Sequence, residues 1–478
     1  MNYEPVIGLE VHVQLKTESK IFCGCPAKFG AGPNTQTCPV CLGLPGTLPV
    51  LNKKVLEYGV KTALALNCSI QPFIKFDRKN YFYPDLPKNY QISQYDLPLS
   101  YKGYIDINTD GSIRRIGITR LHLEEDAGKL LHEGSDAASS YVDFNRTGIP
   151  LLEIVSEPDI NSPQEAYEYL TSLKAILKYL DISDCDMEKG SLRCDANISI
   201  RPKGEKKLGT KTELKNMNSF KAVRSALEFE LIRQTKAKEN NLKITQETLL
   251  WDEKMQKTIT MRTKEEAHDY RYFPEPDLVP FVIEEKDILS IKNNLPELPR
   301  QKYSRLLASY ELSEYEANIL TSDKNLAEYF EIGAQIYKNY KNLTNWMLGA
   351  FLSELNNRKI APENSPVAAR DLINLLKITD EGKINNLTAK AVLTEMFNSG
   401  KSADVIIKDK NLAQISDKGM LSKIIDETIK ENPSPVSDYK NGKENALMFI
   451  MGQAMKKAKG KANPKIINEL LKERMKNA

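Results

Sequence analysis

The segment Gly8–Leu15 alternates polar and apolar residues so strictly that it constrains both the local fold and the placement of reactive side chains. Successive side chains of a β-strand point to opposite faces, so Glu10, His12 and Gln14 are predicted to share one face while the leucines and valines between them pack against a core. A carboxylate and an imidazole two residues apart form a candidate site for metal binding or proton transfer. The alternative is an exposed polar face that carries one histidine.

A second alternating strand is predicted over residues 114–125, with Arg120, His122 and Glu124 on one face. Strict alternation aims Glu124 and Glu125 apart, so only one of them enters a given site unless the strand bends. Carboxylates from several strand ends suit Mg²⁺, which binds few protein carboxylates and keeps water or substrate phosphate as its other ligands. A solvated acidic rim is the alternative.

Further carboxylates and basic groups surround these strands. Glu153 ends an apolar segment, and Lys79 and Lys88 lie in a loop, residues 76–90, where lysines, aromatic residues and two prolines alternate. Such a loop is predicted to be extended and to offer phosphate contacts and stacking surfaces, or else to be a rigid surface loop. The segment 192–201 is predicted to be a strand with a face for a charged substrate, or a wet outer face. The polar residues assigned to that face are Arg193, Asp195, Asn197, Ser199 and Arg201.

Four of the seven cysteines crowd one glycine-rich segment, residues 23–46, which we call the knuckle. Cys-x-Cys followed by Cys-Pro-Val-Cys has the spacing of a tetrahedral zinc site, and no histidine interrupts it. Because four thiolates leave no open position, the predicted zinc is structural. The alternative is four unrelated buried cysteines. The predicted zinc ligands are Cys23, Cys25, Cys38 and Cys41.

Length and composition bound the remaining possibilities. A chain of 478 residues exceeds one ordinary core, so two or three domains are expected. The hydrophobic content is 41%, and no apolar run approaches the roughly 18 residues that a membrane span needs, so we expect a soluble, cytoplasmic protein. The net charge is only +3, so any polyanion is expected to bind at local basic patches. Strands and helices mix without βαβ regularity in the first half, so the predicted class is α+β.

The second half reads as helical after a proline-rich linker, residues 293–299. A capping box is predicted at 313–316, and a strongly basic segment, 452–464, precedes the last helix. Lysines clustered in that way can neutralise RNA phosphates without reading bases, although basic tails are common. One helix is predicted to carry an apolar stripe. Its members are Leu326, Phe330, Ile332 and Ile336.

Five motifs together resemble the B subunit of the tRNA-dependent aspartyl/glutamyl amidotransferases, from one end of the chain to the other. The resemblance implies a cradle-shaped catalytic domain over 1–293, a helical domain over 294–405 and a helical, tRNA-binding tail over 406–478. It also implies a complex with a glutaminase of the amidase family, the A subunit, and with a small C subunit. Leu249 and Lys211 stand where family members often have Arg, which argues against an ionic role for residue 249. The motifs are Gly8–Leu15, His122–Gly128, Asp143–Asp159, Gly190–Asn197 and Glu265–Asp277.

The reaction implied is phosphorylation, by ATP and Mg²⁺, of the side-chain carboxylate of Glu or Asp esterified to tRNA, followed by attack of ammonia. No phosphate-binding glycine loop is present, so ATP binding rests on the resemblance alone. The Mg²⁺ candidates are Glu10, His12, Glu125 and Glu153, and the nucleotide-binding candidates are Arg193, Asp195 and Asn197. The full set of predicted catalytic residues is Glu10, His12, Lys79, Lys88, Glu124, Glu125 and Glu153.

Two other classes remain open from the residues alone. A zinc-stabilised RNA-binding scaffold accounts for the knuckle, the basic tail and the aromatic loops. A metallohydrolase built on Glu10 and His12 accounts for the strand motif and predicts turnover without ATP. No cysteine outside the knuckle lies in a recognisable nucleophile motif, so ammonia is expected to come from a partner through an internal passage, with Lys79, Lys88 and Glu125 at its end.

Overall fold

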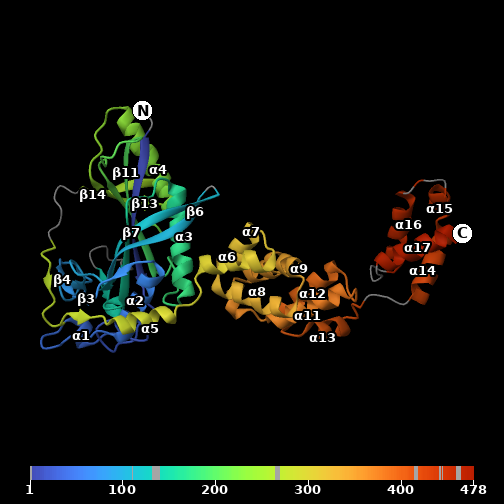
Figure 1. The fold of residues 1–478 in the computed structure, drawn as a ribbon, viewed down its shortest axis with the longest axis horizontal. Coiled ribbons are helices and arrows are strands. Elements are labelled where there is room, and N and C mark those ends of the chain that lie inside the picture. The colour runs from blue at the N-terminus through green and yellow to red at the C-terminus, as the bar shows by residue number, and fades with distance from the viewer. Residues whose placement is uncertain are drawn as a thin grey trace. The chain divides into compact units, whose positions relative to one another are not determined.

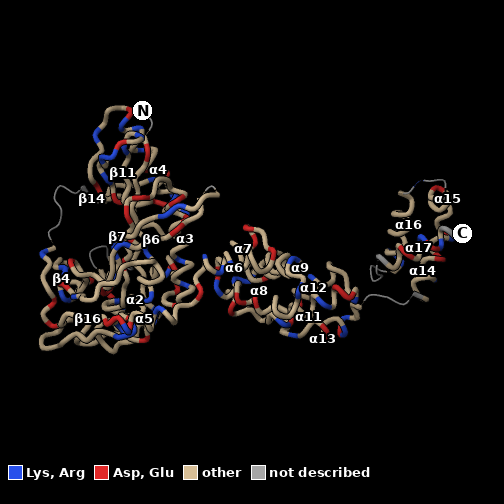
Figure 2. Tube along the Cα trace, viewed as in Figure 1, with Lys and Arg blue, Asp and Glu red and all other residues tan. Residues whose placement is uncertain are grey.

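The computed structural model describes residues 3–109, 111–131, 140–263, 270–413, 418–440, 443, 445–458 and 464–477. The chain divides into two compact units, Met1–Pro299 and Arg300–Ala478. Basic and acidic residues are interspersed along both units (Figure 2). Among the described residues, none of the helices combines the length and the hydropathy that spanning a membrane requires.

A nine-stranded sheet organises the first unit (Figure 1). Neighbouring strands are antiparallel except for the pair β12 and β13. In spatial order the strands are β14 (Lys257–Thr263), β13 (Glu247–Asp252), β12 (Thr212–Lys215), β11 (Leu192–Pro202), β1 (Tyr3–Gln14), β10 (Pro150–Ser156), β7 (Ser112–Glu125), β6 (Ser100–Thr109) and β2 (Ser69–Ile70).

Smaller strand pairs and helices complete this unit. The small sheets are β15 (Phe273–Pro274) with β4 (Asp77–Asn80) and β5 (Tyr90–Ser93), β16 (Phe281–Val282) with β3 (Phe73–Ile74), and β8 (Lys129–Leu131) with β9 (Tyr141–Asp143). The helices are α1 (Pro39–Leu42), α2 (Lys53–Ala65), the 3₁₀-helix η1 (Phe144–Arg146), α3 (Pro163–Tyr179), α4 (Phe220–Glu239) and α5 (Glu285–Asn293).

The strands divide cleanly into an apolar and a polar face. In β1, Leu9, Val11 and Val13 are at most 1% exposed and belong to the core that α3 and α4 also line. Figure 1 shows these two helices running beside the long strands. The polar residues of β1 therefore line the face that the core does not use, as the alternation predicts. The predicted loop at residues 76–90 is bounded by the short strands β4 and β5.

The second unit is helical and contains two hydrophobic clusters among its described residues. One is built by α6–α13 and the other by α14–α17. The helices are α6 (Pro299–Tyr310), α7 (Glu314–Thr321), α8 (Lys324–Ile336), α9 (Tyr340–Trp346), the π-helix η2 (Met347–Phe351), α10 (Leu352–Arg358), the 3₁₀-helix η3 (Pro362–Asn364), α11 (Ala369–Asp380), α12 (Asn386–Ser399), α13 (Ala403–Asp409), α14 (Lys418–Glu431), α15 (Pro433–Lys440), α16 (Asn445–Lys457) and α17 (Pro464–Asn477).

The predicted α+β class is confirmed, and so is the capping box, in which Ser313 and Glu316 bind each other's backbone N–H. The apolar stripe predicted on α8 is partly wrong. Ile332 and Ile336 are 46% and 38% exposed, because the buried side of α8 continues through Gly333 and Ala334 instead. The three-domain division stays a prediction; its second boundary falls within α13, where Ala403 and Ile406 both pack in the first cluster.

Gly103 in β6 provides the first test of this architecture. A Cβ atom there would lie 2.3 Å from Cys68 Sγ and 2.7 Å from the Leu66 carbonyl oxygen. We expect Gly103→Ala to lower the free energy of unfolding by about 1–3 kcal/mol. Gly8→Ala is the matched control, since its nearest neighbour is Pro158 Cα at 3.9 Å. Urea denaturation of both variants checks this, and equal midpoints would contradict the packing described.

Candidate functional site

The register of four strands places a row of polar side chains across the sheet. His12 of β1 lies opposite Glu153 of β10 on one side and Arg193 of β11 on the other. Glu153 in turn lies opposite His122 of β7. Directly opposed residues share a face, so residues separated by more than a hundred positions in sequence meet on one surface.

His12, His122 and Glu153 of this row form a compact cluster with Glu124. His12 Nε2 lies 3.3 Å from Glu153 Oε2 and 3.5 Å from Glu124 Oε1. His122 Nε2 lies 3.2 Å from the same Glu153 oxygen and 3.8 Å from Glu124 Oε2. Ser93 Oγ of β5 donates a hydrogen bond to Glu124 Oε2 at 3.2 Å. Both carboxylates therefore have partners although they are buried.

The mutual charges of this cluster shift the pKa of each member. Burial alone would lower the pKa of His122, but Glu153 and Glu124 outweigh it and raise that pKa to about 9. Burial would also lower the pKa of His12, but that pKa is raised, and Glu153 is the strongest of the groups that raise it. Burial would raise the pKa of both glutamates, yet the histidines hold them below the ordinary value. Protonation of the two histidines and ionisation of the two glutamates therefore favour one another.

His12, Glu124 and Glu153 also form a candidate metal site. One ligand atom from each lies within 4.8 Å of the others. Two carboxylate oxygens and an imidazole nitrogen that has lost its proton are suitable donors for a divalent cation, with further positions for water or phosphate oxygens. Of the four predicted magnesium ligands, His12 and Glu153 belong to this group, whereas Glu10 and Glu125 lie outside it.

Glu10 lies one row along the sheet, opposite Asp195 of β11. Asn197 Nδ2 donates a hydrogen bond to Glu10 Oε1 at 3.0 Å. Burial, followed by the charges of Glu153 and Asp195, raises the pKa of Glu10. Asp195 forms an ion pair with Lys215 of β12, and Lys215 Nζ is also 3.1 Å from Glu213 Oε1. Beyond the cluster, the polar face therefore carries an acidic patch in which Lys215 bridges Asp195 and Glu213.

Arg193 borders the cluster from β11. Its Nη2 lies 3.0 Å from Asp126 Oδ2, which also accepts a hydrogen bond from Gln14 Nε2 at 3.0 Å. The ion pair with Asp126 holds the guanidinium on the face that carries His12, with the Arg193 side chain partly exposed. Arg193, Asp195 and Asn197 therefore share the polar face as predicted, while their nucleotide-binding role stays a prediction.

Lys79 of β4 approaches the cluster from the small sheet. Its Nζ lies 4.9 Å from the centre of the Tyr270 ring and 5.9 Å from that of Tyr81. Burial would lower the pKa of Lys79, but the charge of Glu124 outweighs it and the pKa is raised. A cation held over aromatic faces near two carboxylates is placed to attract an anionic substrate. Tyr272, which stacks on Tyr95 at 4.2 Å between ring centres, extends this aromatic wall.

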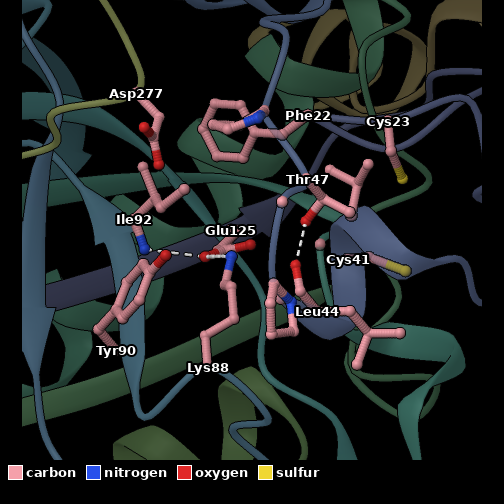
Figure 3. A pocket seen from close by; sticks show the side chains of 16 residues that line it. Phe22, Cys23, Cys41, Leu44, Thr47, Lys88, Tyr90, Ile92, Glu125 and Asp277 are labelled. Carbon is pink, nitrogen blue, oxygen red and sulfur yellow. Dashed lines mark hydrogen bonds and ion pairs between the residues drawn. The ribbon is translucent and has the colours of Figure 1, made fainter.

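Lys88 and Glu125 form a separate ion pair in a pocket of about 200 Å³ (Figure 3). Ile92 N–H donates to Glu125 Oε1 at 2.9 Å, so both partners are held rigidly. Alternation along β7 sends Glu125 away from Glu124, as expected for a strand that does not bend there. A Cβ on Gly43 would lie 2.2 Å from Lys88 Cγ, so the absence of a side chain lets Lys88 pass against the knuckle.

The knuckle lines the other side of this pocket through Cys23 and Cys41, whose sulfur atoms point away from Lys88 and Glu125 (Figure 3). The Sγ atoms of all four knuckle cysteines lie within 4.8 Å of one another. Cys38 N–H also donates to Cys41 Sγ at 3.2 Å. Such a donor set fits one tetrahedral metal ion held by thiolates. In the absence of metal, a hydrogen bond from Cys23 is the main influence that lowers the pKa of Cys41, to about 5.

Several functional candidates were not predicted from the sequence. Alternation placed His122 on the face of Glu124, and that spacing would have been a sufficient signal to name it as a candidate, although it was not predicted as one. The other residues depend on contacts between distant segments, for which the sequence carries no local signal. Part of the Glu265–Asp277 motif, residues 264–269, lies outside the described residues. The candidates found only in the structure are His122, Asp126, Glu213, Lys215, Tyr270 and Tyr272.

Comparison with known proteins identifies the class to which this fold and site belong. Residues 5–289 match the GatB/GatE catalytic domain, and residues 328–475 match the GatB domain. The chain belongs to the family of aspartyl/glutamyl-tRNA(Asn/Gln) amidotransferase B subunits. The relative from Moorella thermoacetica is 57% identical over 99% of this chain and 100% of its own length. The relatives from Carboxydothermus hydrogenoformans and Thermodesulfovibrio yellowstonii are 56% and 54% identical, over 99% and 98% of this chain and 99% of each relative.

The raised pKa of His122 predicts a specific pH dependence of stability in protein freed of metal by a chelator. An unfolded histidine titrates near pH 6.5, whereas His122 in the fold has a pKa of about 9. The folded state holds the proton more tightly, so this stabilisation is complete below about pH 6.5 and is lost as pH rises through 9. Chemical denaturation between pH 6 and 10 measures it. The decline should be smaller in His122→Gln, and parallel curves for the two proteins would contradict the assignment.

Proposed function

We propose that this chain is the component that activates and amidates the aminoacyl group of mischarged tRNA. The substrates are Glu-tRNA(Gln), Asp-tRNA(Asn) or both, together with ATP, and the products are Gln-tRNA(Gln) or Asn-tRNA(Asn). The single observation that carries this proposal is the cluster of His12, Glu124 and Glu153 on a sheet face flanked by the cations Arg193 and Lys79. The names of the relatives supply the substrate class.

The chemistry requires two balanced steps. A carboxylate cannot accept ammonia directly because oxide would have to leave. Transfer of the γ-phosphoryl group of ATP to the side-chain carboxylate forms an acyl phosphate and ADP. Ammonia then attacks the acyl carbon, and the bond between that carbon and the phosphate oxygen breaks. An amide and inorganic phosphate leave, with the third proton of ammonia carried by the phosphate as HPO4²⁻. The protein contributes chiefly positioning and charge stabilisation to the first step.

His12, Glu124 and Glu153 are the residues that would hold Mg²⁺ in this proposal. When bound, Mg²⁺ neutralises charge on the transferring phosphoryl group. His12 must lose its proton to act as a ligand, and His122 keeps Glu153 oriented through its contact of 3.2 Å. Lys79, a cation held next to Glu124 by aromatic faces, is placed to bind phosphate oxygens, and Arg193 to orient a second anionic group.

Ammonia handling is proposed for Lys88 and Glu125. Their pocket is separate from the three-residue cluster and is polar at its floor. Glu125 is placed to take a proton from NH₄⁺, which leaves the nucleophile NH₃, and Lys88 limits where that carboxylate can point. The ammonia source we propose is a glutaminase of the amidase family, the A subunit, assembled with a small C subunit. The relatives' designation as B subunits supports an assembly of several chains.

The remaining proposals concern the knuckle and the tail. A structural zinc bound by four thiolates would stiffen a segment that has almost no core of its own: of its cysteines, only Cys41 is buried. The tail, proposed as residues 406–478, would contact tRNA phosphates. Its support is the basic segment at 452–464, of which 459–463 lie outside the described residues, and a family match that reaches residue 475.

One prediction of the proposed function separates the activation step from the amidation step. In a reconstituted complex with an inactivated glutaminase and added ammonium, His12→Ala and Glu153→Gln should lower tRNA-dependent ADP release and amidation together, by about 10²-fold or more. Glu125→Gln should retain ADP release but lower amidation, because its pocket acts after phosphorylation. Radiolabelled ATP and aminoacyl-tRNA chromatography give both rates.

The control for this assay is Glu205→Gln, an exposed glutamate in the loop after β11. It should behave as the unmodified protein. Hydrolytic turnover of the aminoacyl-tRNA without ATP would support the metallohydrolase alternative, and tRNA binding with no turnover under any condition would support the RNA-binding scaffold.

Another prediction of the proposed function concerns the knuckle. Purified protein should contain one zinc per chain, and Cys38→Ser should lose it and melt at a lower temperature because a ligand and its charge are removed. Elemental analysis and calorimetry measure the two effects. Cys68→Ser, which alters a buried cysteine of the main core, is the control and should keep the metal. Full zinc content and an unchanged melting temperature in Cys38→Ser would refute the site.

A further inference from the structure

Lys20 is a completely buried lysine immediately before the knuckle, with 0% of its surface exposed. Its ammonium group donates two hydrogen bonds, to the Gln36 carbonyl oxygen at 2.7 Å and to Cys41 Sγ at 3.7 Å. Within the described part of the chain, no carboxylate forms an ion pair with it. A lysine is almost never fully buried without an anionic partner, because the loss of hydration costs several kcal/mol.

Of the two described groups that the ammonium contacts, the Cys41 sulfur is the one that can carry a negative charge. A cluster of four thiolates around one divalent cation carries two net negative charges, whereas four neutral thiols carry none. A buried ammonium in contact with one sulfur therefore fits the metal-loaded knuckle, with its four thiolates, better than a metal-free knuckle in which fewer sulfur atoms are charged. The Cys38 backbone N–H, 3.2 Å from the same sulfur, is a second donor to Cys41.

The backbone fixes Lys20 in this position from both sides. Its own N–H donates to the Cys25 carbonyl oxygen at 3.0 Å, within the knuckle. A Cβ on Gly148 would lie 3.5 Å from Lys20 Cδ and 3.5 Å from Cys41 Cβ, so the lysine stem and the cysteine pack against the same glycine. Because the side chain is closed off from solvent, its charge must be balanced where it is.

We propose that Lys20 is the counter-cation of the four-cysteine site: it neutralises part of the charge of the thiolates through Cys41 and thereby sets how tightly the knuckle holds its metal. The inference rests on the proposed zinc site. It concerns a residue that contributes no ligand atom, and it predicts that the size of Lys20's effect on stability depends on whether metal is present.

The test uses the full chain with Lys20→Met, which keeps most of the length and removes the charge, and Lys20→Gln, which keeps an N–H donor. The control is Lys28→Met, an exposed lysine within the knuckle. Zinc affinity is measured by competition with a chromophoric chelator under reducing conditions, and unfolding of the zinc-loaded and zinc-free proteins is followed by circular dichroism. Zinc affinity should fall about 10–100-fold in Lys20→Met and Lys20→Gln and should be unchanged in Lys28→Met.

The zinc-free proteins give an independent readout. Without metal, Lys20 faces less thiolate charge, so Lys20→Met should lower the stability of the zinc-free protein less than it lowers that of the zinc-loaded protein. Equal zinc affinity in all four proteins would overturn the role of Lys20 while leaving the zinc site in place. Failure of the unmodified protein to bind zinc would overturn both proposals. A loss of stability by Lys20→Met that is equal with and without zinc would show that the lysine acts through packing alone, and would also overturn the inference.

Discussion

The antiparallel register around β1 is the constraint on which the site depends. His12 faces Glu153 and Arg193, and Glu153 faces His122, only because β1, β10, β11 and β7 pair without a one-residue slip across this row. A slip of one residue would send these side chains into the apolar core and bring leucines and valines to the polar face. The hydrophobic core thus specifies the geometry of the cluster, although it contributes no atom to the chemistry.

Charge compensation then shapes each part of the first unit. Glu124 and Glu153 are balanced by two histidines, Glu125 by Lys88, and Asp126 by Arg193. A divalent cation would take over the role that the protons of the histidines play in its absence, so metal binding and proton release are linked. The same reasoning links Lys20 to the thiolates of the knuckle.

Local patterns were enough to predict the individual elements, and long-range pairing decided the rest. Alternation was sufficient to predict β1, β7 and β11 and the separation of Glu124 from Glu125, and cysteine spacing was sufficient to predict that four sulfur atoms meet. Alternation does not determine the register in which β7 pairs with β10, so it could not predict the contact of His122 with Glu153. Lys20 looks like an ordinary surface lysine in the sequence, because its burial arises from the fold of the knuckle over Gly148. The stripe on α8 failed since Gly333 and Ala334, small and easily overlooked, form its buried side.

The central claim is that His12 is a ligand of the divalent cation used for activation, and the most direct measurement is pulsed electron paramagnetic resonance of Mn²⁺ bound in place of Mg²⁺ with ATP present. We expect a nitrogen coupling from a directly bound imidazole in the unmodified protein, its retention in His122→Gln, and its loss in His12→Gln. A coupling that persists in His12→Gln, or that is absent from the unmodified protein with Mn²⁺ bound, would contradict the account.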